Sequence, residues 1–233
     1  YDVAKTCLDL GKHVLVEKPV AHSLDHVKEL CDLAASKNLV LQAGHILLFT
    51  ETTQFIKNIT NANKIKFLQT RRCNFGNIPH NQIDLALHLL VHDLALVDNV
   101  KSETIEHANV TGSDILKTKY ADNIQTHIQW QTFTSSHECS WYYPVKTRSI
   151  VIQTEKDLIY CDDNNNTVIH KQGTYTNKLE LVYENQIQLD DQSSPMHREI
   201  ENLLSSVDNK NLQASNGIDH ILRVYNNLYG IIL

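Results

Sequence analysis

Residues 2–45 alternate between helical and strand patterns, and this alternation restricts the fold more than any other stretch of the chain. Gly11 is a typical C-cap of the first helix, and Ser23 is a typical N-cap of the next. The helix, strand, helix and strand are predicted over residues 2–10, 14–16, 24–34 and 39–45. This order indicates two parallel strands joined by a helical crossover, the unit from which doubly wound α/β sheets are built.

The first predicted strand ends in a charged, proline-containing segment, Glu17-Lys18-Pro19. Its apolar residues Val14–Val16 are expected to be buried on both faces, as is typical of strands in parallel sheets. Lys18 then lies at the carboxyl end of a parallel strand, where open α/β sheets bind ligands, and Pro19 ends the ladder of hydrogen bonds. The alternative is an ordinary surface turn without a function.

In these residues the chain resembles the Gfo/Idh/MocA family of nicotinamide-dependent oxidoreductases. The matching pieces are Gly11–Pro19 and Gly44-His45, whereas the following run, Ile46–Glu51, lacks the polar, arginine-containing sequence of the family. The resemblance implies that residues 1–48 are the C-terminal part of a Rossmann-like dinucleotide-binding domain. It also implies that residues 49–233 form an α+β substrate-binding and oligomerisation domain.

The resemblance implies NAD or NADP as the cofactor, and it places this cofactor beside Glu17, Lys18, Pro19 and His45. None of the seven glycines forms the Gly-x-Gly pair with which a dinucleotide fold approaches the pyrophosphate. Since the family has that turn several strands earlier, we expect most of the N-terminal Rossmann domain to be missing from this chain. The shortened sheet would have an exposed edge. Three explanations are open: a partner covers this edge, the remnant is loosely ordered, or the chain is part of a longer product.

Residues 84–97 form a long helical pattern and are the second place where chemistry is expected. Asp84, His88 and His92 are spaced by four, so they share one face of an α-helix. Two histidines at this spacing and a carboxylate are also a possible zinc set. However, no His-Glu-x-x-His pattern or second ligand cluster accompanies them, and we predict no metal. The structural alternative is a pair of partly buried, hydrogen-bonded histidines.

The pair His92-Asp93 also resembles the family, while His88 stands where the family has an aspartate. The resemblance implies that Lys18, His92 and His88 are catalytic residues. Lys18 would stabilise a developing alkoxide, and His92 would exchange the proton of the substrate hydroxyl group. The hydride itself requires the nicotinamide.

A strand pattern covers residues 64–72, and strand patterns dominate residues 124–183. Apolar and polar residues alternate over 124–132, which predicts a strand with one buried face. The predicted fold class is therefore α/β plus α+β, a remnant of a doubly wound parallel sheet followed by a large, mainly antiparallel sheet with helices on one face. Two C-terminal helices, with apolar stripes facing the core, are predicted over residues 195–207 and 218–228.

The segments Trp141–Arg148 and Asp162-Asp163 resemble family members that act on nucleotide-linked sugars. The resemblance implies a sugar or sugar-nucleotide substrate. It also implies a homo-oligomer that forms through the open face of the C-terminal sheet, where tyrosine and tryptophan suit either an interface or a core.

The composition excludes several other classes of function. A net charge of −6 without a basic cluster argues against nucleic acid as a partner, and no apolar run approaches the length of a membrane span. The five cysteines are scattered without a Cys-x-x-Cys pair, which indicates reduced thiols and a cytoplasmic protein.

Two functions follow as predictions. The first is an NAD(P)-dependent oxidoreductase that transfers hydride to or from a hydroxyl carbon of a sugar or sugar-nucleotide, in a cleft between residues 15–20 and 84–93. The isolated chain is expected to be inactive without the missing nucleotide-binding half. The second is a catalytically inactive, truncated family member that serves as an oligomerisation or scaffold module.

Overall fold

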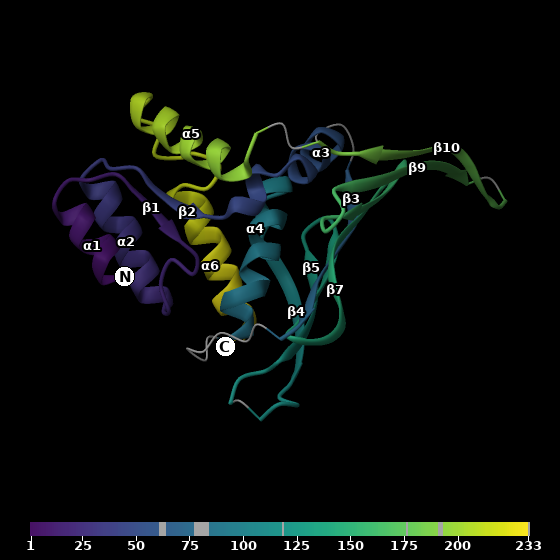
Figure 1. Cartoon of the computed structure of the whole chain (residues 1–233), viewed down its shortest axis with the longest axis horizontal. Coiled ribbons are helices and arrows are strands. Elements are labelled where there is room, and N and C mark those ends of the chain that lie inside the picture. Colours follow the sequence, from purple (N-terminus) through teal and green to yellow (C-terminus); the bar gives the residue numbers. More distant parts are fainter. Residues whose placement is uncertain (61–63, 77–83, 118, 176, 191–192, 233) are drawn as a thin grey trace. The chain divides into compact units, whose positions relative to one another are not determined.

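The computed structural model describes residues 1–60, 64–76, 84–117, 119–175, 177–190 and 193–232 (Figure 1). The chain forms two compact units, and each is described by itself. The first comprises Tyr1–Thr50, Leu94–Ser102 and Asp191–Leu233, and the second comprises Glu51–Asp93 and Glu103–Asp190. The two units interleave along the sequence, and in this they differ from the predicted linear division after residue 48.

The first unit contains a two-stranded parallel sheet with helices. Its elements are α1 (Asp2–Asp9), β1 (Val14–Glu17), α2 (Leu24–Ser36), β2 (Leu41–Gly44), η1 (Ile46–Phe49), α5 (Pro195–Asp208), α6 (Ile218–Ile232) and the later part of α4 (Val91–Val100). Strand β1 runs parallel to β2, with Val14 opposite Leu41 and Glu17 opposite Gly44. The predicted parallel βαβ arrangement is confirmed, and Ser23 caps α2 by accepting a hydrogen bond of 3.3 Å from the His26 backbone N–H.

The two strands are buried to different degrees. Every residue of β2 is buried, whereas Val14–Val16 of β1 are only half-buried. The prediction that β1 is buried on both faces is therefore wrong. Its physical reason lies in the sheet, since among the described residues β1 pairs with β2 alone and is an edge strand.

The C-terminal helices bury unlike faces. In α6 the predicted apolar stripe is confirmed, because Ile221, Val224, Tyr225 and Leu228 are buried. In α5 the predicted stripe is confirmed only in part, because Leu203 and Val207 are half-buried but Ile200 and Leu204 are exposed. The fully buried residues of α5 are Glu199 and Ser206. The Ser206 hydroxyl accepts a 2.9 Å hydrogen bond from Gln42 Nε2 of β2, so a polar contact fixes the orientation of α5.

The second unit is built on one large sheet. Its elements are α3 (Glu51–Thr60), β3 (Ile65–Phe75), η2 (Ala86–Leu90), the start of α4, β4 (Ile105–Ser113), β5 (Asn123–Trp130), β6 (Thr134–Ser140), β7 (Tyr142–Thr154), β8 (Asp157–Asp162), β9 (Thr167–Tyr175) and β10 (Leu179–Gln188). The strand order is β10-β9-β8-β7-β3-β6-β5-β4. Only the pairing of β3 with β6 is parallel among the described strands of this sheet, so the predicted mainly antiparallel sheet is confirmed.

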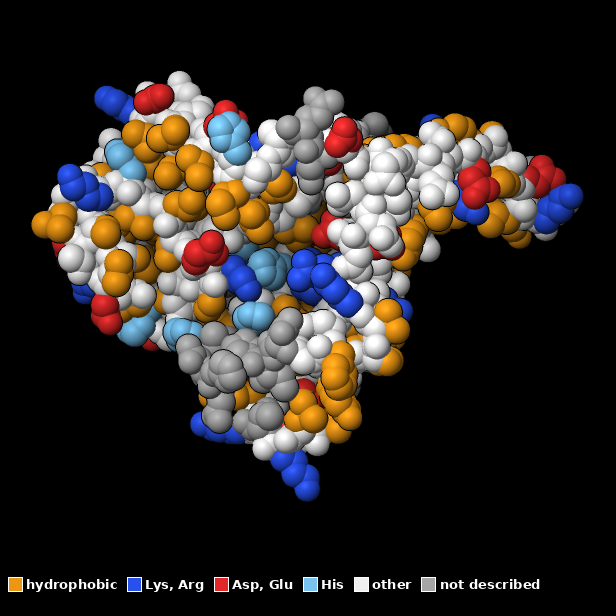
Figure 2. Space-filling model, in the orientation of Figure 1, with side chains coloured by type: hydrophobic (Ala, Val, Ile, Leu, Met, Phe, Trp, Pro, Cys, Tyr) orange, Lys and Arg blue, Asp and Glu red, His pale blue; other side chains and the backbone are white. Residues whose placement is uncertain are grey.

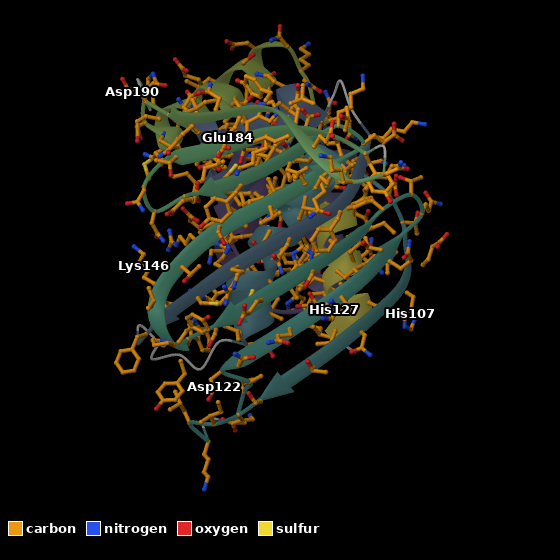
Figure 3. The ribbon with its side chains drawn as sticks, turned by 90° about the vertical axis from the view of Figure 1, so that its right-hand side faces the viewer. His107, Asp122, His127, Lys146, Glu184 and Asp190 are labelled. Carbon is orange, nitrogen blue, oxygen red and sulfur yellow. The ribbon has the colours of Figure 1, made fainter. Side chains whose placement is uncertain are left out.

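The two faces of this sheet differ in polarity. In β5, Ile124, Ile128 and Trp130 are buried, whereas Gln125, His127 and Gln129 are exposed, as the alternation predicts. The indole of Trp130 donates a 2.8 Å hydrogen bond to Ser135 in the core. Figure 3 looks onto the face that carries His127, and the side chains on this face of β5 are polar.

Strand β10 is exposed along almost its whole length. Its exposed apolar residues include Leu179, Leu181 and Val182, and they lie on the right-hand arm in Figure 2, where charged residues are interspersed with them. None of the helices in the described part of the chain has the length and hydropathy of a membrane span. All five cysteines are free.

Candidate functional site

The ends of β1 and β2 bring together the residues predicted to bind the cofactor. Glu17 is the last residue of β1 and pairs with Gly44 of β2, and Lys18 and Pro19 follow, joined by a cis peptide bond. A Cβ at Gly44 would lie 3.0 Å from Glu17 Oε2 and 3.1 Å from Glu17 Cα. A side chain at residue 44 would therefore crowd the backbone of Glu17, which would have to shift by a few tenths of an ångström.

A buried polar network lies behind these strand ends, within the first unit. The Asp98 carboxylate of α4 accepts hydrogen bonds from His220 Nδ1 at 2.7 Å and from Arg223 Nε at 2.7 Å and Nη2 at 3.0 Å. Burial by itself would raise the pKa of Asp98, but the hydrogen bonds from His220 and Arg223 outweigh it and lower the pKa to about 2. The Asp98 carboxylate is thus ionised between α4 and α6, and the Arg223 guanidinium balances its charge.

His45 connects this network to the strand ends. Its ring is fully buried and packs edge-on against the ring of His220, with 5.4 Å between the centroids. Burial lowers the pKa of His45 well below its ordinary value. Electrostatic interactions with His220 and Lys18 lower this pKa further. His45 is consequently a neutral imidazole in the folded protein. Because it is fully buried, it packs beneath the strand ends.

Glu199 of α5 adds an unusual carboxyl group to the same unit. It is 4% exposed, and its Oε1 atom has no hydrogen-bond partner among the described residues. Burial, and secondarily the charge of Glu17, raise the pKa of Glu199 to about 7. This carboxyl group therefore titrates near neutral pH, a property that is common at functional sites.

The helix that carries the predicted catalytic histidines begins in an unusual way. The predicted helix over residues 84–97 is confirmed, but its first part, η2, is a π-helix that includes His88. Asp84 precedes it and accepts a 2.7 Å hydrogen bond from the Ala86 backbone N–H. A π-helical turn places residues four apart differently from an α-helix, so the common face inferred from spacing alone does not hold for His88.

A buried ion pair anchors the residue next to His92. Asp93 is fully buried and accepts hydrogen bonds from Arg72 Nε and Nη2 of β3, each at 3.0 Å. Burial would lower the pKa of Arg72, but the charge of Asp93 outweighs it and the pKa is raised. Because Asp93 is held in this way, the first turn of α4, which carries His92, is fixed on the second unit.

The predicted site residues fall into two groups. Glu17, Lys18, Pro19 and His45 meet at the strand ends of the first unit, whereas His88 and His92 lie half-buried on one helical segment of the second. The ring of His88 packs against Trp141, with 5.6 Å between the centroids. That Lys18 and His92 face one cavity stays a prediction. Across the described ranges, no group of three or more His, Cys, Asp or Glu residues is arranged to hold a metal ion.

Sequence reasoning missed the buried network of Asp98, His220 and Arg223. Asp98 lies 122 residues before His220 and 125 residues before Arg223 along the chain. The signal that could have indicated this network is His220, an imidazole side chain on the otherwise apolar face of α6. Such a residue must find a partner when it is buried.

Comparison with known proteins supports the assignment of the first segment. Residues 1–45 match the profile of the Gfo/Idh/MocA proteins, described as an oxidoreductase family with an NAD-binding Rossmann fold. Biliverdin reductase A of Mus musculus is 46% identical over 56 residues, which are 24% of this chain and 19% of that protein. UDP-N-acetylglucosamine 3-dehydrogenase of Acidithiobacillus ferrooxidans is 27% identical over 96 residues, 41% of this chain and 30% of that protein. These matches span less than a third of each relative.

Solved structures share the fold of nearly the whole chain. The UDP-N-acetylglucosamine 3-dehydrogenase GnnA from A. ferrooxidans superposes with a TM-score of 0.84 at 20% identity, covering 99% of this chain and 73% of that one. An inositol dehydrogenase homolog from Azotobacter vinelandii, complexed with NADH and myo-inositol, superposes with a TM-score of 0.82 at 11% identity, covering 99% and 71%. At such identities the likeness concerns the fold.

Proposed function

We propose that this chain belongs to the Gfo/Idh/MocA oxidoreductases and supplies the substrate side of an NAD(P)-dependent dehydrogenase. The observation that carries the proposal is the pairing of Glu17-Lys18-Pro19 with Gly44-His45 at the carboxyl ends of two parallel strands. This pair of strand ends lies within residues 1–45, which match the family profile. In an open α/β sheet this edge is where ligands bind.

The proposed substrate is a sugar or sugar-nucleotide with a hydroxyl-bearing carbon. The Lys18 ammonium group stabilises the developing alkoxide, and His92 takes or returns the hydroxyl proton, because an imidazole titrates near neutral pH. His88 would take part in the same proton exchange. The buried Arg72–Asp93 ion pair supports the role of His92, because it fixes the start of α4, where His92 lies.

The proposed cofactor is NAD or NADP, and the residues present fit one end of it. Glu17, Lys18 and Pro19 would border the nicotinamide, which supplies or accepts the hydride when it is bound. The fully buried His45 would support this edge from behind. No Gly-x-Gly turn occurs in the chain, so these residues would hold the nicotinamide and not the pyrophosphate. Residues 1–48 are accordingly proposed to be one part of a dinucleotide-binding domain.

A second candidate function is a non-catalytic oligomerisation module. It is favoured by the exposed apolar residues of β10 and by the lack of a pyrophosphate-binding turn in this chain. Residues 49–233 would then serve as an assembly domain that forms homo-oligomers through the large sheet.

Binding of reduced nicotinamide mononucleotide separates the two candidates, because this ligand lacks the adenylate half and needs no pyrophosphate turn. For a dehydrogenase we expect saturable binding, measured by nicotinamide fluorescence, that Lys18→Ala weakens about tenfold or more. Lys12→Ala is the matched control, because it removes the same charge from an exposed residue just before β1. Binding that is absent, or equal in both variants, would favour the assembly module.

A further inference from the structure

A cationic notch opens in the second unit where β7 and β8 separate. The two strands pair from Ser149 opposite Asp162 to Gln153 opposite Leu158, and beyond Asp162 the chain turns away into a hairpin. The resulting cavity of about 470 Å³ lies between the first half of β7 and this hairpin, and we call it the β7–β8 notch. Its volume falls within the range of small-molecule sites, roughly 300–1,000 Å³.

Two cations line the β7–β8 notch, and neither is neutralised. Lys146 and Arg148 of β7 both contribute to its wall, and both side chains are exposed. Within the described ranges no carboxylate forms an ion pair with either of them. Figure 3 shows Lys146 reaching outward at the rim of the sheet. The chain as a whole carries a net charge of −6, so this concentration of positive charge is local.

The acidic residue of the notch is already engaged. Asp162 Oδ1 accepts a 3.0 Å hydrogen bond from the Asn164 backbone N–H, and Oδ2 accepts a 2.8 Å hydrogen bond from Asn165 Nδ2. Asp162 therefore holds the hairpin in shape, and its oxygens do not pair with Lys146 or Arg148. A lining with two cations and one engaged carboxylate favours an anion.

The cross-strand neighbour of Arg148 strengthens this argument. In the ladder between β3 and β7, Arg148 lies directly opposite Arg72. Arg72 is paired with the buried Asp93, but Arg148 has no such acid. Like charges opposite each other in a sheet are destabilising. Arg148 therefore places an unmatched positive charge beside an arginine whose own charge is balanced by Asp93.

The walls of the notch are fixed before any ligand arrives. Asn164 Nδ2 donates a 3.2 Å hydrogen bond to the Lys146 carbonyl oxygen, which ties the hairpin to β7 across the opening. The Asp163 backbone N–H donates a 2.9 Å hydrogen bond to the Arg148 carbonyl oxygen. Gln188 Nε2 of β10 donates to the carbonyl oxygen of Asn165 at 3.0 Å. A preformed wall loses little conformational freedom on binding.

We infer that the β7–β8 notch binds the phosphate group of a small anionic ligand, with Arg148 and Lys146 as its cationic contacts. The guanidinium group matches phosphate oxygens in pairs, and the ammonium group adds a point charge. This inference extends the proposed function, since a sugar-nucleotide would bring such a phosphate.

Isothermal titration calorimetry of the full chain with UDP, inorganic phosphate and uridine tests the inference. We expect UDP to bind and uridine not to bind. Arg148→Ala should weaken UDP binding about tenfold or more, and Lys146→Ala about threefold. The matched control is Lys156→Ala, which removes one charge from an exposed residue beyond the other end of the β7–β8 ladder and should leave the affinity within about twofold. Arg148→Lys, which keeps the charge, should fall between wild type and Arg148→Ala and serves if the alanine variant fails to fold.

The outcomes separate this inference from the proposed function. Equal binding of UDP and phosphate, both weakened by Arg148→Ala, supports the phosphate site and identifies free phosphate as a sufficient ligand. Uridine binding as tight as UDP, no UDP binding, or indifference to both Arg148 variants would overturn the inference. UDP binding through Arg148 without binding of reduced nicotinamide mononucleotide keeps the notch and removes the dehydrogenase. Binding of reduced nicotinamide mononucleotide that Lys18→Ala weakens, without any UDP binding, does the reverse.

Discussion

Replacing Asp98 by asparagine tests whether the buried network is a source of stability. In the folded chain the pKa of Asp98 is lowered from 3.8 to about 2 by the hydrogen bonds from His220 and Arg223. A difference of about 1.8 pKa units corresponds to roughly 2 kcal/mol of free energy of unfolding. Because the folded pKa is depressed, this contribution is present above about pH 4 and is lost as the pH falls toward 2.

Urea denaturation at several pH values measures this effect. We expect Asp98→Asn to lower the free energy of unfolding by about 2–3 kcal/mol at pH 7, because the partners of the carboxylate lose a charged acceptor. The difference between the variant and the wild type should shrink as the pH falls below 4, because the carboxyl group of the unfolded wild type takes up a proton near pH 3.8 and that of the folded wild type near pH 2.

Asp9→Asn provides the matched control for this measurement. Asp9 pairs with Lys37 at 3.0 Å in the same unit, but its side chain is 52% exposed, so less than about 1 kcal/mol is expected. A loss for Asp98→Asn that is equally large at pH 2.5 and pH 7 would refute the assignment to the charged carboxylate. So would a loss no larger than that of the control.

Three further substitutions probe other contacts. Gly44→Ala should destabilise the chain by about 1–3 kcal/mol because its Cβ would meet the backbone of β1, whereas Gly230→Ala, with nothing within 4 Å, should be neutral or stabilising in thermal unfolding. Arg72→Ala should lower the free energy of unfolding, measured in urea, by about 3–5 kcal/mol, because it leaves the buried Asp93 carboxylate without its cationic partner. As a control, Arg71→Ala removes the partly exposed pair with Glu138 and should change this free energy by about 1 kcal/mol or less. Glu199→Gln should be more stable than wild type at pH 8 by up to about 3 kcal/mol and nearly equal at pH 4. The raised pKa of about 7 makes the folded wild type less stable as the pH rises from about 4.5 through 7, so a variant with no advantage at pH 8 contradicts this reasoning.

Local sequence features were sufficient to predict the helices and strands of residues 1–45. Gly11 and Ser23 mark helix ends that depend on the backbone near each residue, and the structure has helix boundaries close to both. The alternation in β5 likewise reports a local property, namely which side chains point toward the core. These predictions succeeded because they require no knowledge of distant parts of the chain.

The failures concern contacts between distant segments. Ile200 and Leu204 of α5 were predicted to face the core but are exposed. The buried side instead includes Ser206, which accepts a hydrogen bond from Gln42 of β2. The π-helical turn at His88 has no signature in residue spacing, and the network around Asp98 joins helices that lie far apart in the sequence. Burial of β1 was overestimated because pattern alone does not reveal how many strands accompany it.

The interleaving of the units affects how this chain is made on the ribosome. The hydroxyl of Tyr225 accepts a 2.6 Å hydrogen bond from the Val20 backbone N–H, and Asn216 Nδ2 donates to the Ala43 carbonyl oxygen at 2.9 Å. The first unit therefore stays incomplete until residues near 225 have been synthesised, although its strands emerge first. During that interval the second unit, whose last residue is Asp190, can finish folding ahead of the first.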